Sequence, residues 1–253
     1  MINKLFDIDK KKAILTGGAG GLGYGMAEGL IESGVEVAII DISPKLNETV
    51  EALGKKGKVH AIYGDISTSE NRQKAFFEAL EALGGSLDIM INCAGVQKRH
   101  PSEEFPISDW QFVIDINLTA SFELCQLAGR EMLKKGKGKI INVASMLSYF
   151  GGYTVPAYAA SKGGVAQMTK ALSNEWASKG INVNAIAPGY MATEMNTALI
   201  NNPERNEKII ARIPAGRWGT YEDVKGAIIY LSSPASDYIN GAIIPVDGGY
   251  LGN

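Results

Sequence analysis

The sequence predicts an α/β fold in which one doubly wound sheet of seven parallel strands is covered by helices on both faces. Short apolar runs rich in Val and Ile alternate with longer amphipathic stretches through all 253 residues. This rhythm is typical of parallel strands connected by helices. Hydrophobic residues make up 45% of the chain, which is enough to bury one large core. We therefore expect residues 1–253 to form a single domain.

The expected strands are the apolar runs, each short enough to be buried on both faces. They are Ala13–Thr16, Val35–Ile40, Val59–Tyr63, Ile89–Asn92, Ile140–Val143, Val183–Ala187 and Ala242–Val246. The expected helices lie between them, at Gly21–Glu32, Pro44–Leu53, Ser69–Leu83, Asp109–Lys135, Ala157–Ser178 and Tyr221–Leu231. The segment Met191–Arg212 interrupts the alternation. We expect it to form a substrate-binding lid, with a long surface connection as the alternative.

Composition excludes several classes of function. The formal net charge is −2, from 25 basic and 27 acidic residues, so the chain lacks the basic excess of nucleic-acid-binding proteins. The first residues lack a secretory signal, and no stretch has the roughly 20 apolar residues of a membrane helix. We expect a cytoplasmic protein without nucleic-acid or membrane partners. Cys93, Cys125, His60 and His100 are too dispersed to predict a disulfide framework or a metal site.

A glycine-rich turn follows the first expected strand and opens the first expected helix. It reads Thr16-Gly17-Gly18-Ala19-Gly20-Gly21-Leu22-Gly23. Glycines let a pyrophosphate approach the backbone, and the start of the helix offers free N–H groups to phosphates. In this context the turn predicts the dinucleotide site of a Rossmann fold, with a flexible glycine loop as the alternative. Cofactor contacts are expected from Thr16, Gly17, Gly21, Leu22 and Gly23.

Two acidic residues end the next expected strands. Asp41 stands at about the ~20-residue spacing of a carboxylate that binds the adenosine ribose hydroxyls and repels a 2′-phosphate. The residues beside it in the sequence offer no compensating cation, so NAD is expected rather than NADP. Asp65 can accept a hydrogen bond from the adenine amino group. A turn or helix-cap role is the alternative for both acids. Ile42 and Ile66 are expected to line the same site.

Tyr158 and Lys162 lie four residues apart in an expected helix, which puts both side chains on one helix face. A free tyrosine has a pKa of about 10 and is a poor base at neutral pH. A nearby ammonium lowers the pKa of a tyrosine. The pair therefore predicts proton transfer by Tyr158 with Lys162 as its partner, while a solvated helix face is the alternative.

These motifs occur in one order along the whole chain, together with Asn92-Cys93-Ala94-Gly95, Asn117, Ser145 and Pro188-Gly189. As a set they are highly specific, and the chain resembles the short-chain dehydrogenase/reductase family. The resemblance implies a nicotinamide cofactor, no metal, a homotetramer and a catalytic group of Asn117, Ser145, Tyr158 and Lys162. It also implies cofactor contacts from Asn92, Ala94, Gly95, Tyr158, Lys162, Pro188, Gly189, Met191 and Thr193.

The resemblance also implies a role for each member of the catalytic group. Ser145 hydrogen-bonds the substrate oxygen, and Tyr158 exchanges a proton with that oxygen. Lys162 lowers the pKa of the tyrosine and holds the nicotinamide ribose, while Asn117 anchors a water that links Lys162 to solvent. Cys93 stands where the family often has a second asparagine. We expect it to be a small buried residue rather than a reactive thiol.

Some stretches resemble the sugar-acid dehydrogenases of this family. The stretches that resemble dehydrogenases of deoxy-keto-gluconates are Ala144–Ser148, Gly151–Gly152, Val155–Pro156, Asn174–Ala177 and Arg212–Gly219. The stretches that resemble dehydrogenases of gluconate are Gly95–Pro101, Glu104–Pro106 and Thr193–Met195. Both substrates carry a carboxylate. Ser145 and Tyr158 are expected to bind the substrate at its reacting oxygen. Lys98, Arg99 and His100 are expected to bind its carboxylate, and a solvated basic loop is the alternative. For Arg217, a second candidate, a structural role in its turn is favoured.

The leading hypothesis is an NAD-dependent oxidoreductase that interconverts a secondary hydroxyl and a ketone on a sugar acid. A 3-oxoacyl carrier-protein reductase would share the fold and the catalytic group. That function would favour cations near the glycine turn for NADP, and the sequence shows none there. A non-catalytic nucleotide-sensing protein would lack Ser145, Tyr158 or Lys162, and all three are present.

Overall fold

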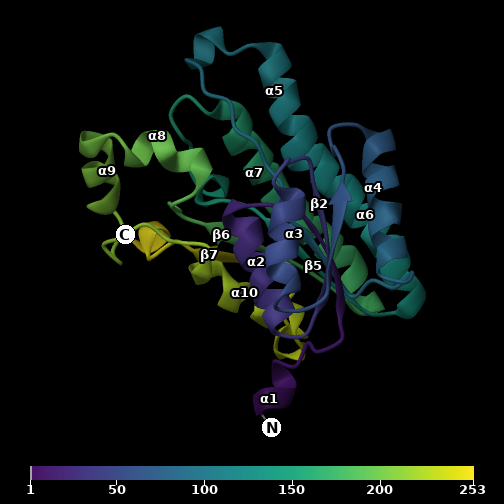
Figure 1. Ribbon diagram of the computed structural model, residues 1–253. Helices are drawn as coiled ribbons and strands as arrows, with labels where there is room; N and C mark the ends of the chain where they lie inside the picture. The colour runs from purple at the N-terminus through teal and green to yellow at the C-terminus, as the bar shows by residue number, and fades with distance from the viewer. Residues whose placement is uncertain (1) are drawn as a thin grey trace.

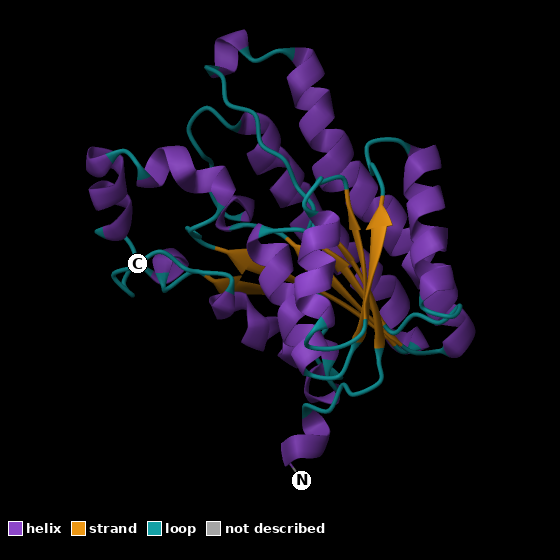
Figure 2. Cartoon of the chain, in the orientation of Figure 1, coloured by secondary structure: helices purple, strands orange, loops and turns teal. Residues whose placement is uncertain are grey.

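The computed structural model describes residues 2–253 and contains one sheet of seven parallel strands. The strands lie side by side in the order β3-β2-β1-β4-β5-β6-β7 (Figures 1 and 2). They are β1 Lys12–Thr16, β2 Glu36–Asp41, β3 Val59–Tyr63, β4 Ile89–Asn92, β5 Gly138–Val143, β6 Ile181–Pro188 and β7 Ile243–Val246. All seven predicted strands are confirmed, with ends that differ by no more than two residues.

Helices cover both faces of this sheet, as predicted (Figure 2). The helices are α1 Ile2–Leu5, α2 Gly21–Glu32, α3 Leu46–Gly54, α4 Ser69–Ala82, α5 Ile107–Ile114, α6 Ala120–Lys135, α7 Pro156–Trp176, α8 Thr197–Ile200, α9 Pro203–Ile210 and α10 Glu222–Ser232. Alternate residues of β1 point to opposite layers. Leu15 packs in the core with α2, α3 and α10, whereas Ile14 packs in the core with α4, α6 and α7. The strand sequence is apolar throughout because both of its faces are buried.

One predicted helix has an irregularity at a candidate site residue. The stretch Asp109–Lys135 was expected to be a continuous helix, but a π-helical turn at Asp115–Thr119 separates α5 from α6. Within this wider turn the hydroxyl of Ser121 donates to the carbonyl oxygen of Asn117 at 2.8 Å. Single π turns inside α-helices frequently occur at functional sites. The hydrophobic pattern did not reveal it because the flanking turns keep the helical period.

The segment 191–212 crosses the carboxyl ends of the strands and contains α8 and α9 (Figure 1). It begins next to the sheet, where Met191 forms an isolated parallel bridge with Gly219. Trp218 Nε1 donates to Asn206 Oδ1 at 2.7 Å and so anchors α9 to the following turn. The segment is therefore a small helical unit rather than an irregular connection, and its action as a lid stays a prediction.

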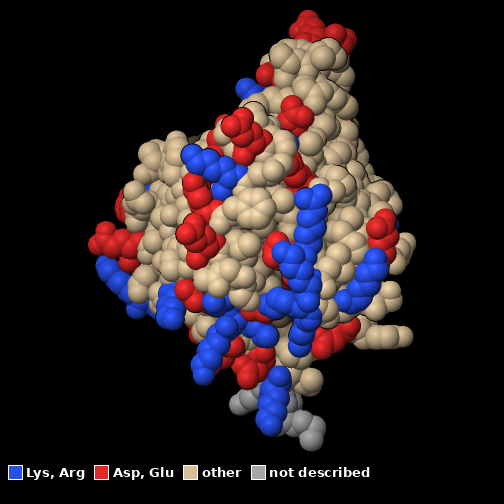
Figure 3. Space-filling model, turned by 90° about the vertical axis from the view of Figure 1, so that its right-hand side faces the viewer, with Lys and Arg blue, Asp and Glu red and all other residues tan. Residues whose placement is uncertain are grey.

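Charged side chains of both signs are mixed on the face of the molecule shown in Figure 3, where acidic groups lie among the basic ones. Such mixing is typical of a solvated surface. Within residues 2–253, none of the helices combines the length and the apolar character needed to cross a bilayer.

Candidate active site

A cleft of about 500 Å³ lies at the carboxyl ends of the strands, where open α/β sheets bind ligands. Its walls come from the turns after β1, β2, β3, β4, β5 and β6, from α7 and from the start of the segment 191–212. Most of the predicted site residues line it: Gly17, Gly21, Leu22, Gly23, Asp41, Ile42, Asp65, Ile66, Ala94, Gly95, Ser145, Tyr158, Lys162, Pro188, Gly189, Met191 and Thr193. The structure thus brings together residues from the whole length of the chain.

The glycine turn is packed so tightly that side chains would not fit at two of its positions. Gly17 has a φ of +74°, and a Cβ there would lie 2.7 Å from the Cα of Ala94. A Cβ on Gly23 would collide with the carbonyl oxygen of Gly17. Helix α2 then begins at Gly21, with Gly20 as its N-cap and no side-chain cap on its N–H groups. This backbone cradle with free N–H groups fits a pyrophosphate.

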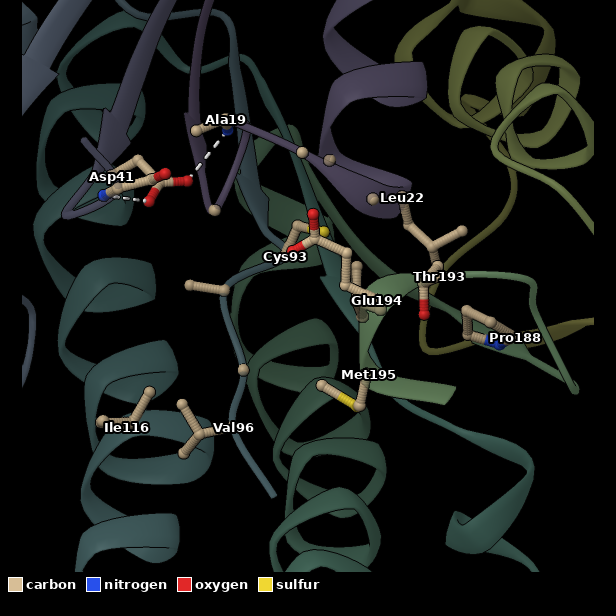
Figure 4. A pocket seen from close by; sticks show the side chains of 18 of the residues that line it. Ala19, Leu22, Asp41, Cys93, Val96, Ile116, Pro188, Thr193, Glu194 and Met195 are labelled. Atoms are coloured by element: carbon tan, nitrogen blue, oxygen red, sulfur yellow. Dashed lines mark hydrogen bonds between the residues drawn. The ribbon is translucent and has the colours of Figure 1, made fainter. Parts of the chain in front are cut away.

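Asp41 lines this cleft at the end of β2 and is held by the backbone (Figure 4). Its Oδ2 accepts a hydrogen bond from the N–H of Ala19, and its Oδ1 accepts one from the N–H of Ser43, both at 2.9 Å. Sequence reasoning missed Lys45, which lines the same cleft. Its Nζ is paired with Glu194 Oε1 at 3.3 Å. The sequence gives no signal for this pair because the two residues come from distant segments.

Asp65 and Ile66 also line the cleft, next to the end of β3. The carboxylate of Asp65 accepts hydrogen bonds from both the N–H and the hydroxyl of Ser67, each at 2.8 Å. This is the turn role that was the alternative for Asp65, and a contact with adenine stays a prediction.

Two residues predicted to contact the cofactor stabilise the walls instead of lining the cleft. Thr16 Oγ1 accepts hydrogen bonds from the N–H groups of Cys93 and Ala94, each at 3.2 Å, and so joins the turns after β1 and β4. The Nδ2 of Asn92 donates to Asn142 Oδ1 at 2.8 Å inside the sheet. Both Thr16 and Asn92 are buried, and their side chains face the protein interior because their strands are covered on both sides.

Ser145 follows β5 and caps a short 3-10 turn at Met146–Ser148. Its Oγ accepts a hydrogen bond from the N–H of Leu147 at 3.1 Å, which leaves its own proton free for another acceptor. Ser148 Oγ accepts from the N–H of Ser145 at 3.3 Å and completes a capping box. A buried serine hydroxyl is thereby fixed on the wall of the cleft.

Tyr158 and Lys162 lie one turn apart in α7, and both face the cleft. Burial raises the pKa of Tyr158, and a hydrogen bond with Ser145 opposes that rise. Burial also lowers the pKa of Lys162, to about 8. Lys162 Nζ donates to the carbonyl oxygen of Val143 at 2.6 Å and lies 5.8 Å from the centre of the Tyr158 ring. Lys162 is not among the groups that shift the pKa of Tyr158 here, because its ammonium is directed at a carbonyl, so the lowering of that pKa by Lys162 stays a prediction.

Asn117 lies in the π turn and is completely buried. Its Oδ1 accepts from the N–H of Val96 at 2.8 Å, while its Nδ2 donates to the Val96 carbonyl at 2.9 Å and to Ser161 Oγ at 3.1 Å. The amide thus fixes the cofactor-side turn after β4 against α7. Both ends of this amide are occupied and its backbone carbonyl already accepts a hydrogen bond from Ser121, so a role of Asn117 in holding a water stays a prediction.

The three predicted carboxylate ligands do not behave alike. Asp109 pairs with His100 Nε2 at 2.7 Å and with Lys98 Nζ at 3.7 Å. Arg99 pairs with no carboxylate among residues 2–253, and with the amide of Gln97 turned to accept, its Nε and one terminal nitrogen lie 2.7 Å from that oxygen. Burial and the nearby Arg205 guanidinium lower the pKa of Arg99. Of the three, Arg99 keeps its charge uncompensated.

Arg217 is occupied by a structural contact. Its guanidinium forms two hydrogen bonds with the carboxylate of Asp223, at 2.8 and 2.7 Å, and a third with the carbonyl of Trp218 at 3.0 Å. This is the turn role that the sequence favoured. In the part of the chain that the structure describes, no group of three or more His, Cys, Asp or Glu residues is arranged to hold a metal ion.

Comparisons with known proteins agree with this arrangement. The family model described as enoyl-(acyl carrier protein) reductase matches residues 17–251. A 2-dehydro-3-deoxy-D-gluconate 5-dehydrogenase of Bacillus subtilis is 44% identical over 99% of this chain and 98% of its own. A 5-keto-D-gluconate 5-reductase of Escherichia coli is 40% identical over 99% of each chain.

A solved structure extends the likeness to three dimensions. It is an Agrobacterium tumefaciens protein described as a candidate 2-deoxy-D-gluconate 3-dehydrogenase, with bound NADP. It is 45% identical, covers 98% of this chain and 99% of its own, and has a TM-score of 0.92. Likeness at this level over both full lengths, together with the cleft that joins Ser145, Tyr158 and Lys162 to a glycine turn, shows that the chain belongs to the short-chain dehydrogenase/reductase family.

Proposed function

We propose that this protein is an NAD-dependent oxidoreductase that interconverts a secondary hydroxyl and a ketone on a six-carbon sugar acid. The most specific form of the proposal is a 2-dehydro-3-deoxy-D-gluconate 5-dehydrogenase, also called 2-deoxy-D-gluconate 3-dehydrogenase. The observation that carries it is the convergence of Ser145, Tyr158 and Lys162 on the nucleotide cleft. Full-length relatives with that name support the choice of substrate.

In this mechanism the chain's own residues bind the reacting oxygen and move its proton. When bound, the nicotinamide supplies or accepts the hydride. The free proton of Ser145 points toward the substrate oxygen, and the Tyr158 hydroxyl donates a proton to that oxygen in reduction and accepts one in oxidation. With a pKa of about 8, Lys162 can gain and lose a proton near neutral pH. That property suits a group that passes protons between Tyr158 and solvent.

Cofactor preference follows from the two charges near the adenosine end of the cleft. The carboxylate of Asp41 would accept hydrogen bonds from ribose hydroxyls and would repel a 2′-phosphate. Lys45 is the cation that could attract a 2′-phosphate, but Glu194 offsets its charge. NAD is therefore preferred. The Agrobacterium tumefaciens relative is described with bound NADP, so a direct comparison of the two cofactors tests this preference.

Arg99 is the residue we assign to the carboxylate of the sugar acid. It is the member of the Lys98-Arg99-His100 group whose charge is not shared with Asp109. A guanidinium binds a carboxylate through two parallel hydrogen bonds. The segment 191–212 carries Arg205 toward Arg99, so a bound carboxylate would relieve the repulsion between the two cations and draw this segment over the substrate as a lid.

A homotetramer is the proposed assembly. The helices α5 and α6 expose Ile107, Phe112 and Phe122, with fractional exposures of 80, 40 and 45%. Exposed apolar side chains on neighbouring helices are typical of surfaces that pack against a second copy. Light scattering during size-exclusion chromatography should give the mass of four chains, and a monomer mass would contradict this proposal.

A substrate panel tests the proposed reaction. Oxidation is assayed with NAD and with NADP, using 2-dehydro-3-deoxygluconate and gluconate as substrates. Reduction is assayed with NADH and with NADPH, using 5-ketogluconate, an acetoacetyl thioester and the oxidation product of 2-dehydro-3-deoxygluconate. We expect the highest kcat/KM with NAD and 2-dehydro-3-deoxygluconate. A preference for gluconate would favour gluconate 5-dehydrogenase, the runner-up suggested by the 5-keto-D-gluconate 5-reductase relative. Turnover of the thioester alone would identify a carrier-protein reductase. If no substrate is turned over, the result would favour a nucleotide-sensing protein.

A further inference from the structure

We propose that Ser148 is a positioning residue that sets the hydroxyl of Ser145 against Tyr158. The inference deepens the proposed function, since it rests on the roles assigned there to Ser145 and Tyr158. Ser148 does not line the cleft, so it acts through other residues.

The hydroxyl of Ser148 connects the two elements that carry the catalytic group. It accepts a hydrogen bond from the N–H of Ser145 at 3.3 Å and donates one to the carbonyl oxygen of Lys162 at 2.7 Å. A serine hydroxyl has one proton to donate and lone pairs to accept, and here both functions are used. The turn after β5 is thereby joined to α7 at Lys162, one helical turn after Tyr158.

The same contact determines what the hydroxyl of Ser145 can do. Because the turn is closed as a capping box, Ser145 Oγ is an acceptor for the N–H of Leu147, at 3.1 Å, and its proton is directed elsewhere. The backbone of Ser145 is fixed relative to α7 through the two hydrogen bonds of Ser148. The distance between the hydroxyls of Ser145 and Tyr158 therefore depends on Ser148.

The next residue provides a natural comparison. Tyr149 also carries a hydroxyl in this turn, and it donates to the carbonyl oxygen of Ile243 in β7 at 3.0 Å. That bond ties the far end of the turn to the sheet edge and reaches no catalytic residue. Removing the Tyr149 hydroxyl deletes one hydrogen bond from the same turn, so Tyr149→Phe is a matched control for the loss of the Ser148 hydroxyl.

The expected effect is on turnover. A misplacement of the reacting groups by about 1 Å costs about 100-fold in rate, and a turn that is still partly held should lose less. We expect Ser148→Ala to lower kcat about tenfold, with KM for the substrate and for the cofactor changed less than about twofold. Ser148→Thr, which keeps the hydroxyl, should restore most of the lost turnover, and Tyr149→Phe should leave kcat unchanged.

A double-mutant cycle tests whether Ser148 works through Ser145. The variants are Ser145→Ala, Ser148→Ala and the double variant, assayed with the sugar acid that gives the highest kcat/KM. Melting temperature and NADH affinity are measured for each. We expect the substitution of Ser148 to have less than about a twofold further effect once the Ser145 hydroxyl is absent. A tenfold further loss in that background, or no rescue by Ser148→Thr, would overturn the proposal.

Two outcomes separate this inference from the proposed function. Full turnover by Ser145→Ala would refute the catalytic role of Ser145 and with it the proposed mechanism. A strong loss in Ser145→Ala combined with wild-type turnover in Ser148→Ala would refute only the positioning role. If Ser148→Ala does not fold, Ser148→Cys decides the question, because a thiol of similar size is a weaker hydrogen-bond donor. Wild-type turnover in that variant would count against the proposal.

Discussion

Two regions of the proposed site are built in different ways. The adenosine side is the region of the glycine turn and Asp41, where we propose that adenosine binds, and the mouth is the loop of Lys98, Arg99 and His100, which lies outside the lining of the cleft. On the adenosine side the backbone sets the shape: Gly23 packs against the Gly17 carbonyl, and Asp41 is held by two N–H groups. At the mouth, the loop of residues 97–100 meets the loop that precedes α7. Thr154 has a φ of +63°, which is rare for a β-branched residue, and its carbonyl accepts the N–H of His100 at 3.1 Å.

This difference explains why the cofactor class is easier to infer from the sequence than the substrate. A backbone cradle tolerates few residue types, so its motif identifies the cofactor class. A mouth made of loop side chains can change its substrate without changing the fold. The five substitutions below test each side of this comparison, from the largest expected effect to the smallest.

The chemical centre, where the two sides meet, should be the most sensitive. Tyr158→Phe removes the proton donor and keeps the aromatic ring, so kcat should fall about 1000-fold, within the usual range for general acid–base groups. NADH affinity, measured by fluorescence titration, should stay within about twofold. Turnover at the wild-type rate would show that another group transfers the proton.

On the adenosine side, Gly23→Ala should weaken NADH binding at least about 100-fold, or about 3 kcal/mol. The added methyl group would collide with the Gly17 carbonyl and displace the phosphate cradle. Gly226→Ala in α10 is the control, because a Cβ there meets no atom within 4 Å and Gly226 does not line the cleft. Equal NADH affinities of the two variants in calorimetry would show that the turn around Gly23 has room for a methyl group.

A buried ion network on α2, the helix that begins in the glycine turn, should contribute to stability. Glu28 is 6% exposed, and its carboxylate contacts Lys56 at 2.6 Å and Lys225 at 2.5 Å. The side chain is more than nine-tenths buried, and although burial raises its pKa, hydrogen bonds from Lys225 and Lys56 lower it from 4.5 to about 2. This lowering corresponds to about 2–3 kcal/mol of stability. The contribution is present above pH 4.5 and is lost as the pH falls toward 2.

Urea denaturation measures this contribution. At pH 7, Glu28→Gln should lower the free energy of unfolding by about 2–3 kcal/mol, and the difference from the wild type should shrink as the pH falls below 4.5. The control lies in the segment 191–212, where the pair of Glu204 and Lys208 is exposed. Glu204→Gln should have no measurable effect. If the two substitutions lowered the free energy of unfolding equally, the buried network would contribute no more to stability than the exposed pair.

At the mouth, Arg99→Ala should raise KM for the sugar acid about 20-fold, or about 2 kcal/mol, with a smaller change in kcat. Lys98→Ala is the control, because Lys98 already shares Asp109 with His100. Steady-state kinetics with both variants decides the assignment. A larger increase in KM for Lys98→Ala would move the carboxylate site to Lys98.

The smallest expected change concerns cofactor choice. Asp41→Ala removes the carboxylate that opposes a 2′-phosphate, so the ratio of kcat/KM for NADP to that for NAD should rise about tenfold, or about 1.4 kcal/mol. Wild-type protein that prefers NADP would refute the assigned role of Asp41.

Prediction from the sequence succeeded where a local pattern carries the information. Apolar runs located the seven strands, and motif spacing located Asp41, Tyr158 and Lys162 on one cleft. It failed where the deciding contact is with a distant backbone group. The bond from Lys162 to the Val143 carbonyl leaves no trace in the residue types, and neither does the burial that raises the pKa of Tyr158.

The same limit applies to side chains whose partners are far away in the chain. Arg99 differs from Lys98 and His100 only because Asp109 reaches the other two. The short helices α8 and α9 were also missed, because stretches of four and eight residues carry too few turns to show a helical period.

Cys93 gives the cleft a property of a different kind. Its sulfur lies beside the catalytic lysine, yet burial raises the pKa of the thiol to about 12. Peroxides and alkylating agents attack the thiolate, and a raised pKa disfavours that form. The half-buried sulfur on the cleft wall is therefore held in its less reactive, protonated form.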